Sequence, residues 1–306
     1  MSRSDLYPDN LKRRHGRDVW FRRSTVLAAS IGLIALAILI AGVLYEGLPW
    51  LSGDFLENYA SRTPSKAGFK AALYGSFWLI GLTAVIAVPI GVAAAIYLEE
   101  YGKRSRFQSL LELLITNLAG VPSILYGMLG LIAFVRMFGA FGEDANLFGI
   151  PLPFGRSVLA GALTLSLLVL PVLIIATREA IRAVPDSLRQ AAFGLGATRW
   201  QCVWHHVLPS ALPGIQTGVI LSLSRALGET APLVMMGALT YVAFTPETIF
   251  DPFTAMPIQI FNWASRPQVD FHGVASAGII VLLAFILVMN SLVLIIRSRV
   301  QKGKSS

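Results

Sequence analysis

Five uncharged apolar runs, each at least 21 residues long, constrain most what this chain can fold into. They cover residues 24–45, 71–98, 113–135, 157–177 and 273–296. At a rise of about 1.5 Å per residue, each run can cross about 30 Å of hydrocarbon as an α-helix. The chain is 55% hydrophobic and only 14% charged, which leaves too little polar surface for a soluble globule of 306 residues. The sequence therefore predicts an all-α, polytopic membrane protein.

A sixth apolar segment, roughly residues 207–238, reaches spanning length only if it accepts Arg225 and Glu229 within it. We therefore expect six transmembrane helices in one domain over residues 24–298. A basic arm over residues 1–23 precedes this domain, and a short tail over residues 299–306 follows it.

The basic residues predict the orientation of the chain in the membrane. The two terminal segments and the two loops expected on the same side carry eighteen Lys and Arg residues, whereas the opposite connections hold few, among them Arg62, Lys66 and Arg266. By the positive-inside rule, both termini are expected to be cytoplasmic. The net charge of +8 is then explained by topology and by contact with lipid headgroups, so no nucleic-acid partner is expected.

One loop expected on the cytoplasmic side, residues 179–209, is too long and too patterned to be a simple connection. Pro185 and Asp186 suit the start of a helix, and Gly194 and Gly196 should end or bend it. The apolar positions that recur at helical spacing on one side are Leu188, Ala191, Ala192 and Leu195, and the polar positions on the other side are Arg189 and Gln190. The pattern predicts a short helix across the membrane face, with a small apolar surface that fits a groove in another protein.

This loop resembles a signature of ABC-importer permeases, EAA-x-x-x-G-x(9)-I-x-L-P. The matching residues are Gln190, Ala191, Ala192, Gly196, Leu208 and Pro209. Gln190 replaces the glutamate of the pattern, and His206 replaces its isoleucine. The resemblance implies the six-helix fold of type I ABC-importer permeases, with a cytoplasmic coupling helix that docks into an ATP-hydrolysing subunit.

Four further stretches resemble the PstA family, permease subunits of high-affinity phosphate importers. They are IYLEEY at 96–101, NLAGVPSILYG at 117–127, SRALGETAPL at 224–233 and PIQIFNWASRP at 257–267. The resemblance implies a bacterial or archaeal plasma membrane, and an assembly with a PstC-like sister permease, an ATPase dimer and an outer phosphate-binding protein. ATP and Mg would bind to the ATPase, and no cofactor or metal is expected on this chain. The chain lacks a G-x-x-x-x-G-K-[ST] phosphate loop, so we expect no catalytic residues on it.

Arg225 and Glu229 are two charged residues within an apolar segment, so their presence there needs an explanation. A charge at the bilayer centre costs roughly 2.5–3.5 kcal/mol on the insertion scale, and Arg225 is expected near the middle of its span. Ser222 continues the same helical stripe as the pair, which should face a bundle interior or a wet cavity. Pro232 cannot donate a backbone hydrogen bond and leaves the carbonyl of Gly228 free, which favours a kink, and we interpret this point as a gate.

Two roles for the charged pair follow. In the first, Arg225 lowers the barrier for a phosphate anion in transit, because its guanidinium fork matches paired oxygens. Glu229 then holds Arg225 when the site is empty, or pairs with a cation of the sister subunit. In the second, the ion pair only fixes helix packing between the two permeases.

Other function classes are possible for this sequence. A permease for another oxyanion, such as sulfate or molybdate, is the main alternative, followed by a stand-alone secondary transporter or channel and by a membrane receptor or scaffold.

A second group of charged residues follows the second apolar run. Glu99 and Glu100, beside Lys103 and Arg104, are most simply interpreted as a solvated edge of the membrane domain.

Overall fold

The computed structural model describes residues 11–102, 105–136, 145–147, 150–152, 155–238 and 241–302. The first ten residues of the predicted basic arm, Lys103, Arg104 and the last four residues of the predicted tail lie outside the described residues. Within the described part, five helices are long and apolar enough to cross a membrane, and a bent helix pair makes a possible sixth span. The five are Arg17–Trp50, Lys70–Tyr101, Val158–Arg182, Arg199–Gly228 and Asp270–Leu292.

One set of helices follows the apolar segments of the sequence. They are α1 (Leu11–Gly47), α3 (Lys70–Ile96), α4 (Arg106–Ala119), α5 (Ser123–Gly130), α6 (Val158–Arg182), α9 (Leu208–Gly228) and α12 (Asp270–Lys302). The other helices are α2 (Gly53–Glu57), α7 (Asp186–Gly194), α8 (Arg199–Cys202), α10 (Ala231–Met236) and α11 (Met256–Ala264). Wide π-helical turns extend three of them: η4 (Tyr97–Tyr101), η5 (Leu131–Arg136) and η7 (Val203–Val207). Two 3₁₀ turns, η2 (Leu48–Trp50) and η3 (Pro64–Lys66), and a small antiparallel hairpin of β1 (Ala145–Leu147) and β2 (Ile150–Leu152) complete the set.

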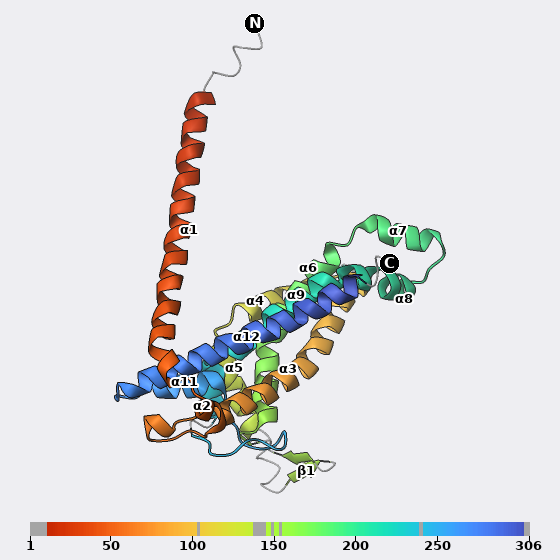
Figure 1. The fold of residues 1–306 in the computed structure, drawn as a ribbon. Helices are drawn as coiled ribbons and strands as arrows, with labels where there is room; N and C mark the ends of the chain where they lie inside the picture. The colour runs from red at the N-terminus through yellow and green to blue at the C-terminus, as the bar shows by residue number, and fades with distance from the viewer. Residues whose placement is uncertain are drawn as a thin grey trace.

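Helix α6 is the centre of the bundle, because 67% of the residues in its most apolar stretch are buried. It packs between α3 and α9, and α12 lies alongside them. The bundle has two distinct ends (Figure 1): α7 and α8 project from one, and α2, α11 and the hairpin gather at the other. We call these the α7 end and the α11 end.

Helix α1 stands apart from the other spans (Figure 1), and none of its most apolar stretch is buried. It meets the bundle at its C-terminal end, where a Cβ added to Gly47 would lie 2.7 Å from the backbone nitrogen of Ala277 on α12. The helix begins at Leu11, so the described part of the predicted basic arm continues into the first span. A free apolar helix of this kind needs lipid or another subunit to cover it.

The predicted span over residues 113–135 is not one straight helix. Helix α4 ends at Ala119 and α5 begins at Ser123, and the two axes are bent by 102°. Pro122 has no backbone N–H and disfavours the helical conformation for the residue before it, which favours a break or kink at this point. The expectation of six apolar spans holds only when this bent pair is counted as one.

Candidate functional site

The Arg225–Glu229 ion pair lies where α9 ends and the chain leaves the helix. Arg225 occupies the last turn of α9, and Glu229 follows the final residue, Gly228, with an extended backbone. Arg225 Nε lies 3.2 Å from Glu229 Oε1, and the side chains are 43% and 18% exposed. Helix α10 begins two residues later, with Pro232 in its first turn. A proline in a first turn needs no backbone donor, so the chain restarts a helix there instead of continuing the old one.

The α9–α10 break lies against the α4–α5 bend. Helices α5 and α10 pack closely, because a Cβ added to Gly127 would lie 2.5 Å from the carbonyl oxygen of Pro232. The Tyr126 hydroxyl donates to the carbonyl oxygen of Leu118 at 2.8 Å and so braces α5 against the last turn of α4. We call Tyr126, Gly127, Arg225, Glu229 and the two helix breaks the break site.

Ser222 is placed in a helix interface instead of beside the ion pair. It is 1% exposed, and its Oγ has no hydrogen-bond partner among the described residues. Gly218, one turn earlier on the same face, lies against Ala176 of α6. This face of α9 therefore packs into the bundle, while the Arg225 side chain reaches the partly exposed side.

Adding one methyl group at Gly127 should damage the break site. Gly127→Ala would place its Cβ against the Pro232 backbone, which cannot give way as a flexible side chain does. We expect a loss of about 1–3 kcal/mol in the free energy of unfolding, the usual cost of overpacking a core, and a matching loss of transport. Chemical denaturation in detergent micelles measures the first quantity.

Gly120→Ala is the matched control, since its Cβ would meet only the Asn117 carbonyl oxygen, at 3.5 Å. Equal stability of the two variants would contradict the close packing of α5 on α10.

The loop after α6 forms the predicted short helix, and we call α7, the turn at Gly196 and α8 the elbow. Helix α7 begins after Pro185 and ends at Gly194. The amide of Ala197 donates to the carbonyl of Ala192 at 3.0 Å, and Gly196 between them has a φ of +82°, which favours glycine. Thr198 then caps α8. Leu208 and Pro209 of the signature lie in the first turn of α9.

The faces of α7 differ from the predicted pattern. Leu188 and Ala192 face the bundle, as does Arg189, whose side chain is 17% exposed. Ala191, Leu195 and Gln190 point outward, and Leu195 is 91% exposed. The apolar residues of this helix are therefore divided between the bundle and the exterior, and the prediction of one shared apolar face is wrong.

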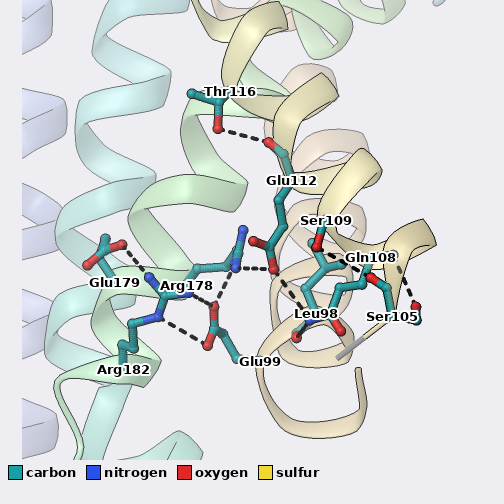
Figure 2. A network of polar contacts seen from close by, with 10 residues as sticks. All are labelled: Leu98, Glu99, Ser105, Gln108, Ser109, Glu112, Thr116, Arg178, Glu179 and Arg182. Carbon is teal, nitrogen blue, oxygen red and sulfur yellow. Dashed lines mark hydrogen bonds and ion pairs between the residues drawn. The ribbon is translucent and has the colours of Figure 1, made fainter. Parts of the chain in front are cut away.

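The prediction that Glu99 and Glu100 are solvated is also wrong. Their side chains are 14% and 12% exposed and lie in the wide turn η4 at the α7 end. Glu99 Oε1 accepts from Arg178 Nε at 2.7 Å and from Arg182 Nη2 at 2.8 Å, both on α6 (Figure 2). Arg178 Nη2 also donates to Glu112 of α4 at 2.8 Å. Three helices thus meet at one buried guanidinium.

Glu100 forms a separate ion pair with α7. Its Oε1 accepts from Arg189 Nη2 at 2.8 Å and from Nε at 3.2 Å. Burial works to lower the pKa of Arg189, but the hydrogen bond and the charge of Glu100 outweigh it and raise the pKa above its ordinary value. An open polar cavity of about 1050 Å³ lies beside both ion pairs. Among the described residues, no group of three or more His, Cys, Asp or Glu side chains is arranged to hold a metal ion.

Comparison with known proteins identifies the family. Residues 87–302 match the family described as "Binding-protein-dependent transport system inner membrane component". The chain belongs to this family. Its membrane-spanning helices and its elbow are therefore those of a transport permease, and the predicted ABC-importer permease fold is confirmed.

Several relatives of this permease are phosphate transport proteins. It is 32% identical over 264 residues to the phosphate transport system permease protein PstA of Haemophilus influenzae, covering 86% of this chain and 88% of that one. It is also 30% identical over 276 residues to the probable ABC transporter permease protein YqgI of Bacillus subtilis, covering 86% and 89%. The predicted resemblance to the PstA permeases is confirmed.

A solved structure shares the fold of the permease. A chain of a bacterial alginate ABC transporter, in complex with a pentasaccharide-bound periplasmic protein, superposes with a TM-score of 0.65 at 18% identity. The match covers 93% of this permease and 96% of that chain.

Proposed function

We propose that this permease is a PstA-type subunit of an ATP-driven phosphate importer and forms half of the translocation pathway. The anion is taken from the PstA relatives, which resemble this chain over most of its length. The observation that carries a transport role is Arg225, a partly exposed arginine held by one carboxylate at the meeting point of two broken helices. Irregular backbone at membrane depth is tolerated only where it is buried in protein or lines a cavity.

Arg225 is the group suited to phosphate within the break site. A guanidinium presents paired donors to paired oxygens, and it stays charged at every physiological pH. Glu229 stabilises the empty site, since an unpaired arginine in the membrane is costly. The pair is long for a charge-assisted hydrogen bond, at 3.2 Å, so an arriving anion has only a weak contact to displace. The break at Gly228 and Pro232 is the proposed gate, because a discontinuous helix can rearrange without breaking a continuous hydrogen-bond ladder.

The proposed assembly contains a PstC-like sister permease, two ATPase subunits and an outer phosphate-binding protein, embedded in lipid. The sister permease would cover two surfaces of this chain, the exposed side of Arg225 and the uncovered length of α1. The α7 end and both termini are then cytoplasmic, in line with the positive-inside rule. In this proposal ATP and Mg bind to the ATPase, and no catalytic residue or cofactor is assigned to this chain.

The elbow is the proposed contact with the ATPase. Its outward residues are Gln190, Ala191 and Leu195, next to the turn at Gly196. Small and apolar groups at an exposed helix suit a groove in a partner, and Gln190 offers an uncharged amide where the signature has a carboxylate. Closure of the ATPases on ATP would then push this elbow and rock the spans between inward and outward openings.

Phosphate uptake tests the proposal directly. Cells that lack their own phosphate importer should regain uptake of labelled phosphate when supplied with this chain and its partner subunits. A tag on this chain should also co-purify the ATPase. Excess unlabelled phosphate should compete, whereas sulfate and molybdate should not.

Competition by sulfate or molybdate instead would point to another oxyanion. Uptake without any ATPase partner would point to a secondary transporter, and either result would contradict the proposal.

A further inference from the structure

The two adjacent carboxylates of η4 bind different helices. Consecutive residues of a helical turn point in different directions, so one cannot replace the other. Glu99 binds Arg178 and Arg182 of α6, and Glu100 binds Arg189 of α7. Both carboxylates are largely buried, where ion pairs are screened little by solvent. The C-terminal end of α3 is therefore tied to two separate elements by two separate charges.

Arg189 is the polar attachment of α7 to the rest of the permease. Besides Glu100, its Nη1 donates to the carbonyl of Val184 at 2.7 Å and its Nη2 to the carbonyl of Ile181 at 3.0 Å. Ile181 lies in the last turn of α6, and Val184 follows its end. One guanidinium thus joins α7, the end of α6 and η4. The other contacts of α7 with the bundle include Leu188 and Ala192, and apolar contacts of this kind are non-directional.

Arg178 connects a fourth element, α4, to η4, α6 and α7. It holds Glu99 on one side and Glu112 of α4 on the other, and its own side chain is only 10% exposed. Gln108 of α4 donates to the carbonyl of Leu98 in η4 at 2.9 Å, so α4 is also bound to that turn directly (Figure 2). The α7 ends of α3 and α6, together with α4 and α7, form one charged network.

We propose that Glu99 and Glu100 form a two-way ion-pair link that makes η4, the end of α6 and α7 move as one body. A push on α7 then reaches α3 and α6 together, and these are the two most extensively packed spans of the described structure. The inference rests on the proposed function, in which an ATPase displaces α7. Apolar contacts alone would let α7 slide over η4, whereas two charged hydrogen bonds to one carboxylate oxygen fix its position.

The test is Glu100→Gln in the assembled complex in proteoliposomes, supplied with phosphate-loaded binding protein. ATP hydrolysis should persist, but the phosphate transported per ATP should fall about tenfold or more, the factor that matches the loss of one charged hydrogen bond. Glu100→Asp keeps the charge and should restore most of this ratio. Glu179→Gln is the matched control, because Glu179 is 64% exposed and its ion pair is with Arg182, at 3.3 Å. An unchanged ratio in Glu100→Gln would overturn the proposal.

A cross-link gives an independent answer. Glu100→Cys and Arg189→Cys, combined with Cys202→Ala to remove the natural thiol, can be joined by a short reducible bis-methanethiosulfonate reagent. If the two elements move as one body, cross-linking should raise the transport-to-hydrolysis ratio, and reduction should lower it again. Arrest of transport by the cross-link would show that they must separate, which would overturn the link. Should the complex carry sulfate or molybdate instead, the proposed substrate fails, while the same ratio measured with that anion still tests the link.

Discussion

Arg225→Ala should reduce phosphate uptake by the assembled importer by about 10- to 100-fold, the factor that corresponds to losing a hydrogen bond to a charged group, about 1.5–3 kcal/mol. The loss has two sources. The anion loses a guanidinium that matches its oxygens, and Glu229, left without its ion-pair partner, repels the anion. Uptake of labelled phosphate, normalised to the amount of assembled complex, is the measurement. Arg225→Lys should recover only part of the activity, since an ammonium keeps the charge but lacks the planar fork.

A double variant separates the two roles of the ion pair. When a pair serves only packing, removing both partners is far less costly than removing one, because no uncompensated charge stays behind. If Arg225 contacts the anion, Arg225→Ala combined with Glu229→Ala should regain only the part of the loss that repulsion by Glu229 causes, and uptake should stay well below that of the unchanged permease. Full recovery of uptake in the double variant would mean that Arg225 only neutralises Glu229, and the transport role would fail.

The apolar runs predicted the spans because length and hydrophobicity decide whether a helix can cross a membrane. They did not predict where helices break. Residues 113–135 contain Gly120 and Pro122, yet an isolated proline is compatible with either a mild kink or a full bend. The bend of 102° is stabilised by contacts that only the fold supplies. These are the Tyr126 hydroxyl on the Leu118 carbonyl and the packing of Gly127 on Pro232.

The charged network was missed for a similar reason. Glu99 and Arg178 are 79 residues apart, and Glu100 and Arg189 are 89 apart, so no local pattern joins them. The sequence does place acidic residues at the end of one span and basic residues at the end of another. That juxtaposition is the signal that was available, because charges at the same end of neighbouring spans can pair. It cannot say which carboxylate meets which guanidinium.

Arg178→Met should destabilise the permease far more than Arg182→Met, although both arginines bind Glu99 from the same face of α6. Methionine is unbranched and apolar, so both changes remove the charge while keeping much of the packing volume. Arg178 is 10% exposed, and its loss leaves Glu112 without its ion-pair partner and Glu99 with Arg182 alone. Removing one partner of a buried ion pair costs about 3–5 kcal/mol, and the remaining contact of Glu99 favours the lower end of that range.

Arg182 is the matched control because its side chain is 53% exposed and Glu99 keeps Arg178 when it is removed. An exposed ion pair contributes under about 1 kcal/mol, so Arg182→Met should shift the free energy of unfolding by no more than that. Chemical denaturation of both variants in the same detergent, followed by tryptophan fluorescence, compares them directly. Equal losses would mean that Glu99 is stabilised by α6 as a whole and not by the one guanidinium that also reaches α4. The connection that Arg178 makes between Glu99 of η4 and Glu112 of α4 would then contribute nothing to stability.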